Sequence, residues 1–284
     1  METFKESIQL APGVYLQASP KKFRLHRLLP WDAAPGSETF GETGDIDLMR
    51  QLMAGALYAG FVQRSPAEKN PDGSVSAPSL LRYIHSLAGS YQTTHATPPT
   101  MRRVAERLAA RGQQSAAAHC LKVAEEEAGH DALALLDLAA LGLPAQEFVA
   151  RLRPINALAL VELFTRLADS EQPIAVLGYA YALERSALFS TEASVAATER
   201  LIPAGIKATR CLRVHSAVGD TETRHVSESI AFMSTLPQQD RAAIVRATHQ
   251  TSSLLCAPHN YPGDAAMRAL LDEFGWVMAE EALA

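Results

Sequence analysis

Three predicted helices of this chain carry single carboxylates and histidines on faces that are otherwise apolar. Residues three or four positions apart lie on the same side of a helix. The first such row consists of Ala116, Cys120, Val123, Glu127, His130, Ala134, Leu138 and Leu141. An ionised group buried without a partner costs several kcal/mol. The fold must therefore supply something that compensates Glu127 and His130.

Two later segments show the same arrangement. One row consists of Cys211, His215, Val218, Glu222, His225, Ser229, Phe232 and Leu236. The other consists of Ile174, Leu177, Tyr181, Glu184 and Leu188. No Lys or Arg falls in any of the three rows, so the compensation has to come from outside them.

Acidic neighbours of these residues fall on different helix faces. Glu126 shares a row with Lys122 and Asp137, which we expect to be solvated, so Glu127 is assigned as the inward carboxylate. The rival row of the later helix consists of Arg213, Asp220, Arg224 and Glu228. That row is an ordinary salt-bridging surface, which favours Glu222 over Asp220 as the inward residue.

A pair of divalent metal ions would compensate the buried groups, because carboxylates and imidazoles are metal ligands. In carboxylate-bridged di-iron proteins, inward Glu and Glu-x-x-His sets on bundle helices form the site. Here Glu-x-x-His occurs twice, as Glu127–His130 and Glu222–His225, with Glu184 between them. A polar core network without metal and a zinc site are the alternatives, although a carboxylate-rich set favours iron or manganese.

The pattern from residue 45 onward predicts an all-α domain of about eight to ten helices. Asp45 is a predicted N-cap for a helix over 46–63, and Ser79 opens another that ends near residue 92. Pro98 and Pro99 are expected to break the chain before a helix over 101–111. Single helices are predicted for 114–141, 173–189 and 207–235, with another beginning at Pro237.

Residues 1–44 contain several prolines that exclude a long helix. We expect them to form an irregular extension, with short strands or extended arms near Val14 and Phe23. The expected division is an N-terminal extension over 1–44 and a helical domain over 45–284.

Composition limits the partners and the compartment. The 284 residues have a formal net charge of -5 and no basic stripe, which argues against nucleic acid. The three cysteines are scattered, which favours a reduced, cytoplasmic setting. The first residues lack the apolar core of a signal peptide, and no apolar run approaches the ~20 residues of a membrane span. Helical bundles of this size often form homodimers, so a homodimer is one expected assembly.

At these motifs the sequence resembles the heme-oxygenase-like diiron oxidases and oxygenases, which are also described as iron-containing redox enzymes. The resemblance covers roughly residues 45–255. It is carried by Glu126-Glu127-Ala-Gly-His130 with a downstream Leu-Gly-Leu-Pro, by 173–185 around Glu184, and by the segment from His215 to His225. It implies a heme-oxygenase-like multi-helix bundle that binds two Fe(II) ions per chain and uses O₂ as co-substrate.

The third segment departs from the pattern of that family, which usually reads His, three residues, Asp, two residues, His. Glu222 and His225 take the last two places, and Val218 stands at the first. His215 lies one turn earlier on the same face. Either His215 reaches the metal, through a helix irregularity, or one iron lacks a histidine. We include His215 among the expected ligands.

The resemblance also implies a function. Glu127 and Glu222 would change between terminal and bridging ligation, Glu184 would open or close a coordination position, and these three are the expected catalytic carboxylates. The substrate would be a small molecule, preferably an amino acid or amine derivative, and the reaction an N-oxygenation, desaturation or oxidative C–C cleavage in a biosynthetic pathway.

Three rival functions are considered. A ferritin-like oxidase or iron store would need a further inward Glu on an early helix. A cofactorless or cysteine-based protein of the same fold would use Cys120 or Cys211, which lie on the inward rows. A non-catalytic binding protein that kept the fold is favoured by Val218.

Overall fold

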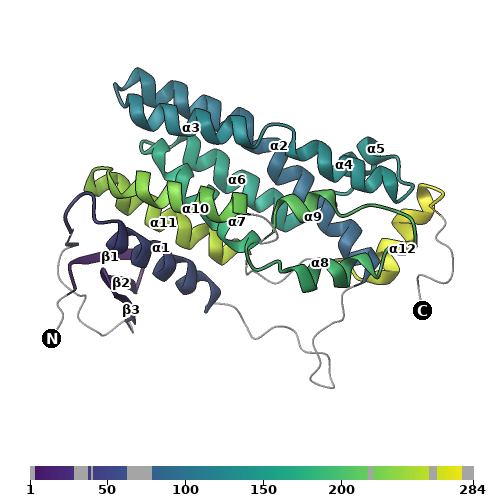
Figure 1. Ribbon diagram of the computed structural model, residues 1–284, viewed down its shortest axis with the longest axis horizontal. Helices are drawn as coiled ribbons and strands as arrows, with labels where there is room; N and C mark the ends of the chain where they lie inside the picture. Colours follow the sequence, from purple (N-terminus) through teal and green to yellow (C-terminus); the bar gives the residue numbers. More distant parts are fainter. Residues whose placement is uncertain are drawn as a thin grey trace.

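The computed structural model describes residues 4–28, 38–39, 41–62, 79–216, 220–255 and 261–276, without the side chains of 220–223. Most of this chain is helical (Figure 1). The helices are α1 (Ile46–Phe61), α2 (Leu80–Ala110), α3 (Gln114–Glu126), α4 (His130–Ala140), α5 (Ala145–Arg151), α6 (Ile155–Asp169), α7 (Val176–Ala187), α8 (Glu192–Glu199), α9 (Arg210–Val214), α10 (Asp220–Ser234), α11 (Gln238–Leu255) and α12 (Asp264–Glu273), with a 3-10 turn η1 (Pro173–Ala175) before α7. The expected all-α class is confirmed.

The described part of the N-terminal segment is more regular than expected. Strands β1 (Glu6–Ala11), β2 (Val14–Ser19) and β3 (Lys22–Arg27) form an antiparallel sheet in the order β1-β2-β3. Alternate residues of β1 are buried, as period-two pleating requires. The sheet packs beside α1 at one end of the bundle (Figure 1). These strands are too short to stand out in the sequence, and the prolines that exclude a helix are compatible with the turns between them.

A buried ion pair joins this sheet to α11. Arg241 on α11 lies 3.5 Å from the carboxylate of Glu6 on β1, and both side chains are almost fully buried. The same guanidinium donates to the carbonyls of Gly41 and Glu42. Burial raises the pKa of Glu6, although Arg241 and a backbone hydrogen bond from Gly41 act in the opposite direction. Without Arg241, the sheet would retain a buried carboxyl group and two carbonyls with no charged partner.

We expect Arg241→Ala to lower the free energy of unfolding by about 3 kcal/mol, because removing one member of a buried ion pair leaves the other buried without a charged partner. Arg246→Ala is a matched control on the same helix. Its pair with Glu38 is about one-third exposed on both sides, so the expected loss is below about 1 kcal/mol. Urea denaturation of the two variants measures both values. Equal losses would show that Glu6 and Arg241 contribute no more than a surface pair.

Helix α2 is a single helix, which corrects the predicted break at Pro98 and Pro99. Its N-terminal half packs in one hydrophobic cluster with α4, α5, α9 and α12, and its C-terminal half packs in a second cluster with α1, α3, α6 and α11. A proline inside a helix costs about 3 kcal/mol. Burial of α2 along both clusters outweighs that cost, so the helix continues through the prolines.

Two helices that the sequence predicts to be continuous are instead interrupted. The first ends as α3 and resumes as α4, with Gly129 between them at φ +87°. A left-handed residue cannot continue a right-handed helix, and glycine adopts this conformation at no steric cost. The second consists of the short α9, which ends at His215, and α10. Both interruptions fall at predicted metal ligands.

A close contact fixes α7 against α11. A Cβ atom on Gly178 would lie 2.1 Å from the carbonyl oxygen of Ile244, so only glycine allows this approach. Thr248 of α11 also donates to the carbonyl of Gly178 at 3.2 Å. These contacts set the position of α7, the helix that carries Glu184.

The described helices include no single one that is long and apolar enough to cross a membrane. A bent pair, Gln114–Ala140 with Ala145–Arg151, passes that test of length and composition with an angle of 106° between its parts.

Candidate metal centre

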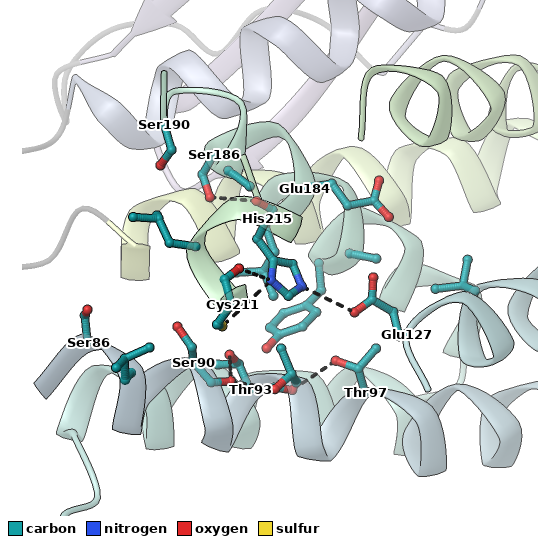
Figure 2. A pocket seen from close by; sticks show the side chains of 18 of the residues that line it. Ser86, Ser90, Thr93, Thr97, Glu127, Glu184, Ser186, Ser190, Cys211 and His215 are labelled. Carbon is teal, nitrogen blue, oxygen red and sulfur yellow. Dashed lines mark hydrogen bonds and ion pairs between the residues drawn. The ribbon is translucent and has the colours of Figure 1, made fainter. Parts of the chain in front are cut away.

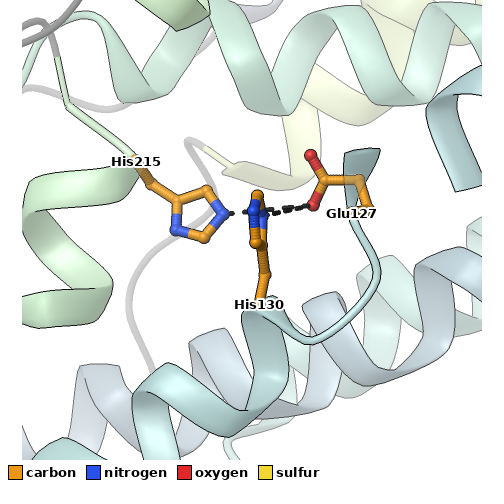
Figure 3. Close-up of side chains that lie close together, drawn as sticks. All are labelled: Glu127, His130 and His215. Atoms are coloured by element: carbon orange, nitrogen blue, oxygen red, sulfur yellow. Dashed lines mark hydrogen bonds and ion pairs between the residues drawn. The ribbon is translucent and has the colours of Figure 1, made fainter. Parts of the chain in front are cut away.

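Three of the predicted ligands meet where α3 ends and α4 begins. One ligand atom each from Glu127, His130 and His215 lie within 4.8 Å of one another (Figure 3). The Nδ1 atom of His130 lies 3.1 Å from Oε2 of Glu127, and Nε2 of His215 lies 4.0 Å from the same oxygen. The two imidazole rings meet edge to face at 4.9 Å between centroids. One carboxylate and two imidazoles thus converge on a common point.

The chain interruption at Gly129 creates this arrangement. Glu127 is the last residue capping α3, and His130 is the first residue of α4. Their side chains therefore come from two helices that meet at a turn. His215 reaches them from the end of α9, which supplies the irregularity that the sequence requires if this histidine is to approach the metal.

The orientation of His215 leaves one ring nitrogen available. Its Nδ1 lies 3.0 Å from the carbonyl oxygen of Cys211, which places the proton on Nδ1 in the neutral ring. Its Nε2 is buried and has no hydrogen-bond partner. A metal-bound histidine usually donates the N–H of its other ring nitrogen to a carboxylate, a backbone carbonyl or water, as Nδ1 of His215 does to Cys211. The donor set and this unsatisfied nitrogen fit a divalent metal ion.

Electrostatics couple the three side chains when no metal is bound. Burial alone would raise the pKa of Glu127, but the imidazoles of His130, at 3.1 Å, and of His215, at 4.0 Å, outweigh it and lower the pKa to about 2. Burial alone would lower the pKa of His215, but its neighbours Cys211 and Glu127 outweigh it and raise the pKa to about 11. A protonated His215 therefore balances Glu127 in the metal-free protein.

A second buried carboxylate holds α9 in place. Asp137 on α4 is fully buried, which corrects the expectation that it lies on a solvated row with Glu126. It accepts a hydrogen bond from the backbone N–H of Cys211 at 2.8 Å and pairs with Arg210 at 3.1 Å. Both partners lie in the first turn of α9, so Asp137 caps that helix from a neighbouring one. His215 ends the same helix, and its position depends on this cap.

We expect Asp137→Ala to lower the free energy of unfolding by about 2–3 kcal/mol, because it leaves the Cys211 N–H unpaired in the interior. Arg210 is partly exposed, so its charge pair adds little to that value. Amide hydrogen exchange should accelerate in α9. Asp131→Ala, which removes the partner of the exposed His95, is the control and should cost below about 1 kcal/mol. Unchanged exchange in α9 would contradict the capping role.

The remaining predicted ligands lie outside this cluster. Glu184 lines a cavity beside it. His225 is buried on α10, and its Nε2 lies 3.4 Å from the carboxylate of Glu126. Glu222 belongs to α10, but its side chain lies outside the described residues, as does all of Val218. Glu126, which the sequence assigns to solvent, thus contacts a predicted ligand and also pairs with Lys122 at 3.7 Å.

A cavity of about 670 Å³ opens against the cluster (Figure 2). This volume is within the range of small-molecule sites. Glu127 and His215 lie in its wall, and His130 does not. The other walls come from α2, α7 and α9, so any group bound at the cluster would face a space large enough for a small substrate.

Aromatic side chains of α2 and α7 differ in whether they line the cavity. Tyr83 and Tyr179 line it, but Tyr181, His85 and Tyr91 do not. The hydroxyl of Tyr83 donates to the carbonyl of Ala208 at 2.7 Å. Serines and threonines of α2 form much of the remaining polar wall. The sequence does not predict this role, because single hydroxyl residues on a helix carry no distinctive signal.

Comparison with known proteins supports the fold. The chain is similar to a solved domain of unknown function with a heme oxygenase-like fold from Shewanella denitrificans OS217. The TM-score is 0.52 with 16% sequence identity, over 80% of this chain and 90% of that chain. No family model matches the sequence, and no curated protein matches it. The predicted heme-oxygenase-like fold is thereby confirmed, and the likeness concerns the fold alone.

Proposed function

We propose that this protein is a non-heme iron enzyme that uses O₂ to oxidise a small molecule. The observation that carries the proposal is the convergence of Glu127, His130 and His215 beside the cavity, with Nε2 of His215 buried and unsatisfied. Carboxylate and imidazole together suit iron or manganese, and the absence of thiolate from the cluster disfavours a structural zinc site.

We further propose that the centre holds two iron ions, the second bound by Glu184, Glu222 and His225. Two features support this part. Glu184 lines the same cavity as Glu127 and His215. His225 is buried, and its Nε2 lies 3.4 Å from the carboxylate of Glu126, the residue next to Glu127.

Bound iron would pass electrons to O₂, which would be reduced as the substrate is oxidised, and the protein side chains would hold the metal and position the substrate. The carboxylates of Glu127 and Glu184 lie in the cavity wall. There they would bind the metal or accept a proton from a bound molecule. The carbonyl of Cys211 fixes the ring of His215. Apolar residues of α2, α7 and α9 exclude water from the bound substrate.

A cysteine-based reaction is the weaker candidate. Cys211 lies in the cavity wall, with Sγ 3.9 Å from Nδ1 of His215. A histidine that activates a thiol must direct a basic nitrogen at the sulfur. Here Nδ1 is closer to the carbonyl oxygen of the same cysteine, at 3.0 Å, and its proton is directed there.

Anaerobic titration with Fe(II) tests the proposal. The wild-type protein should bind two irons per chain and oxidise them when O₂ is admitted, as followed with a ferrous-specific chelator. Glu127→Ala, His130→Ala and His215→Ala should each weaken iron binding by at least about 100-fold. Loss of a residue that only hydrogen-bonds to a metal ligand costs up to about that much, and loss of a ligand should cost more. Glu184→Ala, Glu222→Ala and His225→Ala should reduce the stoichiometry to one.

His95→Ala and Glu162→Ala are the matched controls, because both side chains are exposed and lie outside the cluster. They should bind iron as the wild type does. Wild-type affinity in the three cluster variants would exclude this site. Retention of zinc with no uptake of iron would exclude the oxidase.

Metal binding should also release a proton. With a pKa of about 11, His215 is protonated at neutral pH, and a metal ion must displace that proton, whereas Glu127, with a pKa of about 2, is already ionised. Affinity should therefore rise about tenfold per pH unit between about pH 6 and 8. Calorimetry in buffers of different ionisation enthalpy counts the proton. Affinity that does not change with pH would contradict this ion pair.

A further inference from the structure

One wall of the cavity is a row of hydroxyl groups. Ser86, Ser90, Thr93 and Thr97 follow one another at helical spacing on α2, and all four line the cavity (Figure 2). Residues at this spacing share one face of a helix. In the view of Figure 2 the row runs from Ser86 at the left to Thr97 below Glu127.

Most of these hydroxyls use their proton within the helix. Ser86 donates to the carbonyl of Tyr83 at 2.7 Å, Thr93 to that of Ser90 at 3.1 Å, and Thr97 to that of Thr93 at 3.0 Å. A hydroxyl has one proton and two lone pairs. These oxygens therefore face the cavity as hydrogen-bond acceptors.

The same cavity contains a tyrosine whose hydroxyl has no hydrogen-bond partner in the protein. Tyr179 is 1% exposed, lines the cavity, and its hydroxyl oxygen has no hydrogen-bond partner. Its ring stacks on Phe164 with centroids 4.2 Å apart, so the hydroxyl is held in place. A buried hydroxyl without a partner is costly, which indicates that a bound molecule completes it.

The charges of the lining favour one sign of ligand. Among the described lining residues, the carboxylates are Glu127 and Glu184, and no Lys or Arg occurs. The ring nitrogens of His215 are directed at the Cys211 carbonyl and at Glu127. Arg185 follows Glu184 but lies over the ring of Phe189, outside the lining. A ligand carboxylate would lose its hydration against the α2 wall with no Lys or Arg to replace it, and the basic side chain of the lining, His215, already pairs with Glu127.

We propose that the cavity binds a primary ammonium ion with an apolar body, its N–H groups donating to the hydroxyl row of α2 and to Tyr179. Leu87, Val123, Leu183 and Leu212 of the lining would contact the apolar body. As a substrate assignment this rests on the proposed oxidase function, and it narrows the expected substrate from an amino acid or amine derivative to an amine without a free carboxylate. The amine nitrogen would then lie in the same cavity as Glu127.

Calorimetric titration of the metal-free protein with hexylamine, hexanoate and hexan-1-ol tests the assignment, because the three probes share one chain and differ in the head group. Hexylamine should bind at least about tenfold more tightly than hexanoate. The double variant Thr93→Val and Thr97→Val, and separately Tyr179→Phe, should each lower the affinity for hexylamine several-fold. Thr198→Val is the matched control, since its hydroxyl donates to the carbonyl four residues earlier on α8, outside the cavity.

Hexanoate binding as tightly as hexylamine would overturn the assignment. Unchanged hexylamine binding in both the double variant and Tyr179→Phe would overturn it as well, and the two changes are independent should one of them impair folding. The measurement involves no metal. A cluster that takes up no iron would therefore refute the oxidase while the amine result stands, and failure of amine binding would leave the iron titration unaffected.

Discussion

The geometry of the candidate centre depends on one buried carboxylate. Asp137 accepts the hydrogen bond from the first turn of α9 and pairs with Arg210, and α9 is only five residues long. A helix this short is marginal by itself. Its place, and with it the place of His215, is set by a charge on α4. The fully buried carboxylate of Asp137, which the sequence pattern places on a solvated row, is therefore the one that brings His215 to Glu127 and His130.

Much of the fold follows from sequence pattern, and the departures have physical causes. The N-cap at Asp45 forms as predicted, with its side chain accepting from Leu48, and the heme-oxygenase-like bundle is confirmed. The predicted break at the prolines of α2 is wrong, because burial along two hydrophobic clusters outweighs the low helix propensity of proline. The sequence does not distinguish short strands from extended arms near Val14, because six-residue segments give little periodicity.

The spacing of residues assigns them to the correct helix face only where the helix is continuous. The row that joins Glu126 to Asp137 assumes one helix across Gly129, and the interruption there breaks the register. Asp137 is consequently buried, and Glu126 contacts His225. Glu127 and His130 come together all the same, because a turn can bring residues three apart into contact as a helix does. A single glycine within an apolar helical pattern is tolerated often enough that the sequence could not reveal this interruption.

The two sides of the cavity differ in how extensively they are packed against the rest of the protein. The hydroxyl row stands on α2, a 31-residue helix that packs in both hydrophobic clusters, so its position is fixed by extensive burial. His215 stands at the end of α9, a five-residue helix that places Cys211 in one of these clusters and is capped by Asp137. Local opening is easiest where few buried contacts must be broken. Rearrangement on metal binding should therefore be confined to α9 and His215, while the hydroxyl row of α2 stays in place.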